Sequence, residues 1–143
     1  MAAKKSGATS TATSDINERL NRAISEGRFQ TALELAKQLA KSEPTDANRR
    51  RLAECYLGRA SQFLGEGRMR DAITVLEVGH PFARDMPELI VKFAELFARA
   101  GDAARGMKLL ESLPEPRPTS RLPALAADAA LQRGAAARES LPE

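Results

Sequence analysis

The sequence predicts an all-α protein, and three observations support this fold class. Gly27, Gly67 and Gly101 are each followed five residues later by Ala or Gly, and then by an apolar stripe at helical spacing. These glycines lie 40 and then 34 residues apart, a period typical of stacked helical repeats, and Gly134 follows after a further 33 residues. β-branched residues are scarce, and no run of them shows the alternation of a half-buried strand.

The chain is expected to become ordered at Asp15, because Glu18 follows it at the spacing of a capping box. Residues 1–14 are rich in Ser, Thr and Ala and are expected to form a disordered tail. Apolar residues then recur at helical spacing as far as Gly27, so the first helix is predicted to end there.

Three further helices are predicted in the first half of the chain. The second helix covers 29–42 and ends before Pro44, because proline cannot continue the helical hydrogen bonds. The third is capped by Thr45 or Asp46 and runs to the next glycine turn, and its extra length explains the longer first period. The fourth covers 69–78.

The second half is predicted to start with an irregular connection over 79–84. Asp85 and Glu88 again have the capping-box spacing, so a fifth helix is predicted with Asp85 as its cap, ending at about Ala100. A sixth helix is predicted from the third glycine turn to about Ser112. Residues 113–118 contain three prolines and are expected to form an extended spacer. An alanine-rich last helix is predicted over 120–132.

Charge and hydropathy limit the function classes. The chain has 22 basic and 19 acidic residues, but Lys4 and Lys5 lie in the expected tail. From Asp15 onward 20 basic residues stand against 19 acidic ones, a net charge of +1, which disfavours nucleic acid as the main partner. No apolar run has the ~18 residues of a membrane span, and the first residues do not form a secretory signal. A cytoplasmic protein without a membrane partner is therefore expected.

The sequence contains no catalytic or metal-binding constellation, and no cofactor is expected. His80 is the single histidine, which excludes a two-histidine metal site within one chain. Cys55 is the single cysteine, and a catalytic thiol would need a histidine base beside it. Both residues are expected to be structural, and the chain is expected not to be an enzyme.

Several residue types keep a constant distance from the glycine turns. A small residue lies five residues after each turn glycine. Other small or large residues recur seven residues and four residues before the glycine. These residues are Ala32, Ala72 and Gly106 after the turns; Leu20, Ala60, Ala94 and Ala127 seven before; Ala23, Phe63, Phe97 and Ala130 four before; Tyr56 and Ile90 on first helices; and the closing prolines Pro44 and Pro118. Over about residues 15–135 this pattern resembles the tetratricopeptide repeat (TPR) family.

The resemblance implies a right-handed superhelical stack of antiparallel helix hairpins, an α-solenoid with about three full repeats and a truncated fourth. The repeats would cover about 15–44, 45–84, 85–118 and 119–143. It also implies that the first helix of each pair lines a concave groove for an extended peptide or a helix of another protein. The candidate groove residues are Asn17, Asn21, Glu54, Leu57, Ser61, Val91, Lys92, Glu95, Arg99, Arg121, Leu125 and Asp128.

The leading expectation is a non-enzymatic adaptor or scaffold, either free-standing or the N-terminal part of a longer protein. One alternative is a secretion-type chaperone, which would need an apolar groove. The other is an RNA-binding helical repeat, which the small net charge disfavours. The last helix carries more apolar residues than one neighbour can cover, so it is expected to self-associate or to fray.

Overall fold

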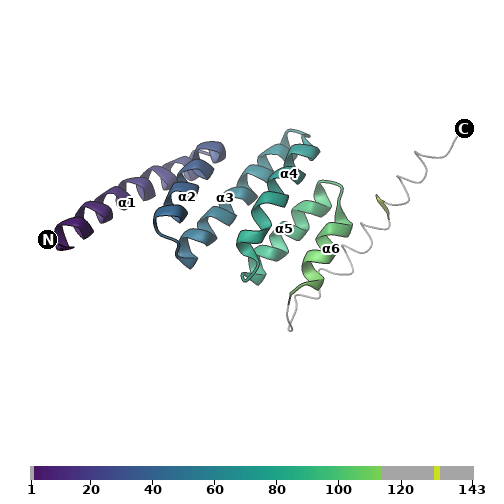
Figure 1. Cartoon of the computed structure of the whole chain (residues 1–143). Helices are drawn as coiled ribbons and strands as arrows, with labels where there is room; N and C mark the ends of the chain where they lie inside the picture. The colour runs from purple at the N-terminus through teal and green to yellow at the C-terminus, as the bar shows by residue number, and fades with distance from the viewer. Residues whose placement is uncertain (1, 114–130, 133–143) are drawn as a thin grey trace, which may run out of the picture.

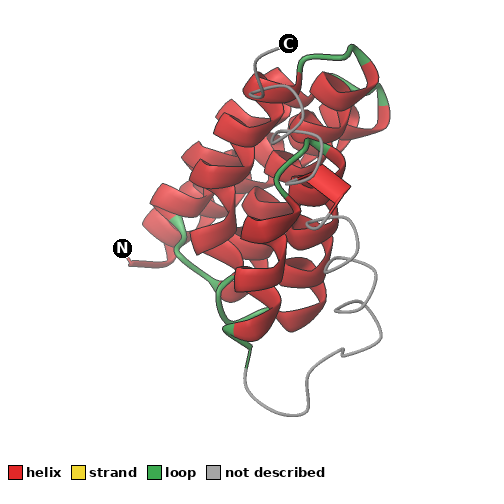
Figure 2. Ribbon diagram, turned by 90° about the vertical axis from the view of Figure 1, so that its right-hand side faces the viewer, coloured by secondary structure: helices red, strands yellow, loops and turns green. Residues whose placement is uncertain are grey.

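The computed structural model describes residues 2–113 and 131–132, and these residues form an all-α fold without strands. In Figure 1 the helices lie side by side in chain order, with α1 at one end and α6 at the other. Figure 2 shows the same helices turned by 90°, joined by short loops. The elements are α1 (Ala2–Ser25), α2 (Phe29–Ser42), α3 (Asp46–Gly65), α4 (Met69–Gly79), the 3₁₀ helix η1 (His80–Ala83), α5 (Pro87–Arg99) and α6 (Ala103–Glu111).

Three turns of the same geometry join α1 to α2, α3 to α4 and α5 to α6. Their glycines have positive φ angles, 72° at Gly27, 76° at Gly67 and 97° at Gly101, which residues with a Cβ rarely adopt. The N–H of Arg28 donates to the carbonyl of Ala23 at 2.8 Å, and the equivalent bonds in the other two turns are also 2.8 Å long. This is the Schellman arrangement, in which a glycine ends one helix and reverses the chain.

One core of buried apolar side chains joins the helices. Phe93 and Phe97 of α5 are its largest fully buried members, and α1, α2, α4 and α6 each contribute a buried leucine. Small residues lie where the helices approach most closely. At Gly79, for example, an added Cβ would lie 2.5 Å from the Cβ of Tyr56. The alanine-rich composition therefore serves close packing between helices.

The start of the first helix differs from the expectation. The helix begins at Ala2, so residues 2–14 are helical, and Asp15 lies inside α1 and is not its cap. The segment has no proline, and it includes four alanines, the residue with the highest helix propensity. Extending an existing helix needs no new nucleus, so a segment of moderate propensity can continue one that the core stabilises.

The connection between α4 and α5 also differs from the expectation. The stretch predicted to be irregular contains η1, and the residue that precedes α5 is Met86, which makes no side-chain capping bond. Asp85 is therefore not the cap of α5. Its carboxylate accepts a hydrogen bond from Arg49 of α3 at 2.7 Å, and this ion pair between α3 and the turn before α5 replaces the local contact that the sequence pattern predicted.

The predictions for the end of the chain lie mostly outside the described residues. These are the spacer over 113–118, the helix over 120–132 and its self-association or fraying, of which the structure describes only Leu113, Leu131 and Gln132. Among the residues that the structure does describe, no helix is both long enough and apolar enough to cross a membrane.

Candidate functional site: a polar network across three helices

Three consecutive arginines, Arg49, Arg50 and Arg51, lie near the start of α3. Successive residues of an α-helix point about 100° apart, so the three guanidinium groups reach different neighbours. Each of them bonds a side chain from outside α3, and together they connect α1, α3 and the segment that leads into α5. These arginines and their polar partners are called the arginine network below.

Arg51 connects α3 to α1. Its guanidinium donates to the Oδ1 atom of Asn17 at 2.7 Å and to the Oδ1 atom of Asn21. The two asparagines are four residues apart, so they lie one above the other on the same face of α1. Two of the predicted groove residues are therefore brought together by an arginine that the sequence analysis did not single out.

Arg50 connects α3 to α5. Its Nε atom donates to Glu54 at 3.0 Å, and its Nη1 atom donates to Glu88 of α5. The hydrogen bond from Arg50 lowers the pKa of the Glu88 carboxyl below its ordinary value, and the charge of Lys92 contributes to this shift. The Arg50–Glu88 pair is exposed to solvent, so it adds little stability.

Arg49 connects the starts of α3 and α5. It donates to Asp46 at 2.8 Å and to Asp85 at 2.7 Å. These groups border a shallow hollow of about 300 Å³ between the two helix starts. The hollow is lined by Asp46, Ala47, Arg49, Arg50, Asp85, Met86 and Glu88, so it offers mostly charged groups.

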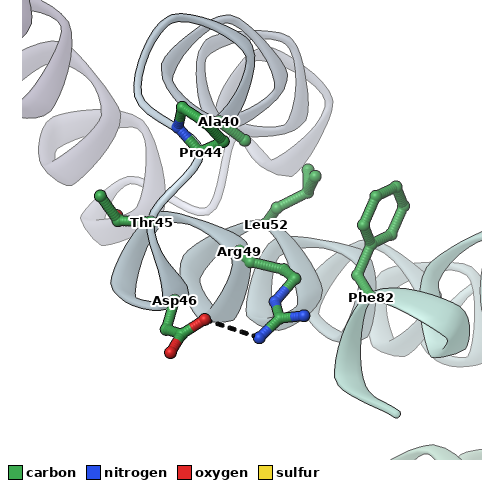
Figure 3. Close-up of a pocket in the computed structure, with 7 residues that line it drawn as sticks. All are labelled: Ala40, Pro44, Thr45, Asp46, Arg49, Leu52 and Phe82. Carbon is green, nitrogen blue, oxygen red and sulfur yellow. Dashed lines mark hydrogen bonds and ion pairs between the residues drawn. The ribbon is translucent and has the colours of Figure 1, made fainter. Parts of the chain in front are cut away.

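A second, more apolar hollow of about 340 Å³ lies on the other side of the Asp46–Arg49 pair (Figure 3). Ala40 and Pro44 lie above α3 in this view, and Leu52 and the Phe82 ring project beside them. Phe82 stacks on Tyr56 with the ring centroids 5.8 Å apart and the planes inclined by 8°. This stacking holds the aromatic wall in place, and the hollow has the character needed to accept an apolar side chain.

The predicted groove residues do not all lie on the surface. Leu57 is buried in the core, with 8% of its surface exposed, so its assignment to a binding surface is corrected. Glu54, three residues before Leu57 on α3, is exposed. Ser61, Lys92 and Arg99 are exposed, Val91 and Glu95 are half-buried, and Arg121, Leu125 and Asp128 lie outside the described residues.

Of the two residues with reactive side chains, Cys55 is buried and His80 is half-buried. Cys55 is 1% exposed, and burial raises the pKa of its thiol to about 11. His80 packs edge-on against Phe97 with the ring centroids 6.1 Å apart, and burial followed by the charge of Arg105 lowers its pKa. In the described part of the chain, no group of three or more His, Cys, Asp or Glu side chains could hold a metal ion.

The sequence contained a signal for the arginine network that the pattern analysis did not use. Three adjacent arginines lie near the start of the third helix, and Glu88 follows Arg50 after 38 residues, close to the repeat period. Residues one period apart lie on neighbouring equivalent helices in a stacked array. Opposite charges at that distance are therefore candidates for pairing between helices.

The sequence matches no family model and no curated protein. The TPR resemblance thus depends on this chain's own turns and packing residues.

Proposed function

We propose that this chain is a TPR-like protein-binding module, a right-handed superhelical stack of hairpins that binds a peptide or helix of another protein. The binding surface in this proposal extends across α1, α3 and α5, the first helices of the three hairpins. The observation that carries the proposal is the arginine network, which links these three helices and no second helix of a hairpin.

The chemistry of the network suits a peptide backbone. Asn17 and Asn21 use their amide oxygens to accept from Arg51, and within the described residues their amide N–H groups have no partner. These groups can donate to the carbonyl groups of a partner chain. The apolar hollow beside Phe82 would accept one apolar side chain, which would set the register of the segment.

A binding role without catalysis accords with the burial of Cys55. A thiol whose pKa is about 11 is mostly protonated near neutral pH and is a poor nucleophile. A single buried cysteine without a disulfide also accords with a cytoplasmic location.

The proposal is tested with two matched double variants that carry the same changes of charge. Asn21→Arg with Lys92→Glu alters exposed positions on the first helices α1 and α5. Gln38→Arg with Lys108→Glu makes equivalent changes at exposed positions on the second helices α2 and α6. Each protein is immobilised, and the proteins that it retains from a lysate of the source cell are quantified by mass spectrometry.

The proposal predicts that at least one partner is retained by the wild type and by the α2/α6 variant but is lost from the α1/α5 variant. All three proteins should have the same circular dichroism spectrum and melting temperature. Equal retention by both variants would remove the assignment of the binding surface to the first helices.

A further inference from the structure

A third hollow, of about 220 Å³, lies between α1 and α2 close to their turn. It is lined by Arg19, Arg22, Ala23, Arg28, Thr31 and Leu35, so three of its lining residues are arginines and none is acidic. It shares no lining residue with the two hollows beside the arginine network. It is therefore a separate concentration of positive charge.

Two of these arginines form no ion pair with any residue that the structure describes. Within the described residues Arg19 and Arg22 form no ion pair, although Asp15 and Glu18 each lie four residues before one of them. Arg28 pairs with Glu26 at 2.6 Å, but both side chains are about half exposed, so the pair is weak and can share its arginine with a ligand. The arginines of the arginine network, in contrast, are already bonded to carboxylates or amides.

A further arginine and a helix N-terminus lie beside this hollow. A neighbouring hollow of about 450 Å³ shares Arg28 and Thr31 and includes Arg59, whose guanidinium lies 4.2 Å from the centroid of the Phe63 ring. That contact fixes the position of a fourth cation, beside the three arginines of the hollow. The first turn of α2 carries no acidic residue and no side-chain cap, so the positive end of its dipole is not compensated there.

We infer that the hollow lined by Arg19, Arg22, Arg28 and Thr31 binds a phosphate monoester, as carried by a phosphorylated serine or threonine of a partner protein. Such a group carries a charge near −2 and three acceptor oxygens at neutral pH. Guanidinium groups donate to these oxygens in pairs, and the Thr31 hydroxyl adds another donor. This site shares no residue with the arginine network, although Arg19 and Arg22 lie on α1 as Asn17 and Asn21 do.

The size and border of the hollow favour a single compact dianion over a polymer. Glu26 and Glu66 lie beside the arginines, in an ion pair with Arg28 and in the lining of the neighbouring hollow. These carboxylates would repel a long polyanion such as RNA, which needs a continuous basic surface. A carboxylate ligand has one charge and two oxygens, so it would leave part of this donor set unused.

The test is a titration of the full chain with N-acetyl-O-phosphoserine amide, in which binding is monitored by heteronuclear NMR and by calorimetry. N-acetylserine amide and N-acetylaspartate amide are the chemical controls, and vesicles with and without phosphatidic acid test a lipid headgroup as the source of the phosphate. We expect saturable binding of the phosphoserine probe, with shifts concentrated between Arg19 and Thr31. Losing a charge-assisted hydrogen bond should weaken affinity about tenfold, so Arg19→Gln with Arg22→Gln should weaken it at least that much.

The matched control is Arg70→Gln with Arg84→Gln, which removes two exposed arginines that line none of the four hollows. It should change the affinity less than twofold, and all variants should melt at the wild-type temperature. The inference is overturned if binding of the phosphoserine probe does not saturate, or if the two double substitutions weaken its affinity equally. It is also overturned if the aspartate probe binds as tightly as the phosphoserine probe. Tight binding to phosphatidic acid vesicles without binding of the phosphoserine probe would also overturn it.

Discussion

Gly106 of α6 packs so closely on Ala94 of α5 that a Cβ at Gly106 would lie 2.5 Å from the carbonyl oxygen of Ala94. Both residues occupy positions where the sequence pattern places small residues, one after the glycine turn and one before it. The atom in the way belongs to the backbone of a helix, so it cannot move aside as the end of a flexible side chain could. The contact sets the distance between the two helices of the third hairpin.

Gly106→Ala should therefore destabilise the protein, although alanine is the better helix former. The helix propensity gain is about 1 kcal/mol, and overpacking against a backbone costs roughly 1–3 kcal/mol. The free energy of unfolding, measured in urea by circular dichroism, should fall. The control is Gly65→Ala in α3, where the added Cβ meets no atom within 4 Å beyond its adjacent residues and the local helix backbone. That variant should be neutral or more stable, and equal effects of the two changes would contradict the packing argument.

Ala72 has the same position in the second hairpin and is completely buried. Ala72→Leu would insert three further carbons between α3 and α4, with an expected cost of roughly 1–3 kcal/mol in the free energy of unfolding. Thr74→Leu, at an exposed position of α4, is the control and should change stability by about 0.5 kcal/mol or less. An unchanged melting temperature for Ala72→Leu would show that the register assigned to this turn is wrong.

The turns and helix spans could be predicted because their causes are local. A glycine with positive φ, a small residue five positions later and a proline past the helix end act within a few residues of one another. The second helix was predicted over 29–42, and the structure has it at Phe29–Ser42. Thr45 was one of two predicted caps, and its hydroxyl accepts from the N–H of Asn48 at 3.1 Å.

The candidate site could be predicted only in part, because its contacts join residues 30 to 38 positions apart. Asp85 has the right spacing for a cap, but the pairing with Arg49 depends on how α3 lies beside α5. Leu57 was predicted to face a groove, but a helix between two neighbours has more than one covered side. Helical periodicity locates a stripe, but it does not state which neighbour covers it.

The thiol of Cys55 should react far more slowly in the folded protein than in the unfolded chain. It is 1% exposed, and burial raises its pKa to about 11 from an ordinary value of 9.0, so little thiolate is present. The measurement is the rate of reaction with a disulfide reagent at about pH 8, with and without urea. A similar rate in both conditions would contradict the burial of this residue.

The same shift makes folding sensitive to alkaline pH. The unfolded chain loses the thiol proton near pH 9, whereas the folded chain keeps it to about pH 11, so stability falls as pH rises through this window. Cys55→Ala should lack this component of the pH dependence. If the free energy of unfolding of Cys55→Ala fell with pH as steeply as that of the wild type between about pH 9 and pH 11, other groups would cause the pH dependence.

His80 should make stability fall on the acid side. Burial and the charge of Arg105 lower its pKa below 6.5, and Glu77 opposes the shift only in part. The unfolded chain therefore binds a proton first as the pH falls, so the stabilising contribution is present above pH 6.5 and is lost below it. The urea midpoint should be lower at about pH 5.5 than at about pH 7.5, and His80→Gln should remove most of that difference. Because His80 is the single histidine, an unchanged difference in the variant would exclude it as the cause.

Gln132 should stabilise the third glycine turn, although it lies 29 residues after Ala103, the first residue of α6. Its Oε1 atom accepts from the N–H of Ala103 at 2.9 Å, and its Nε2 atom donates to the carbonyl of Ala98 at 3.0 Å. One amide thus satisfies a free donor at the start of α6 and a free acceptor at the end of α5. Gln132→Ala removes both bonds, which should cost about 1–2 kcal/mol in the free energy of unfolding.

Hydrogen exchange distinguishes this local effect from a general loss of stability. In Gln132→Ala the amide of Ala103 should exchange faster, while the amides around the Gly27 turn should keep their wild-type protection. Gln62→Ala is the matched control, because Gln62 donates to the carbonyl of Gly27 and should affect only the first turn. Wild-type protection at Ala103 in Gln132→Ala would show that Gln132 does not hold the third turn in solution.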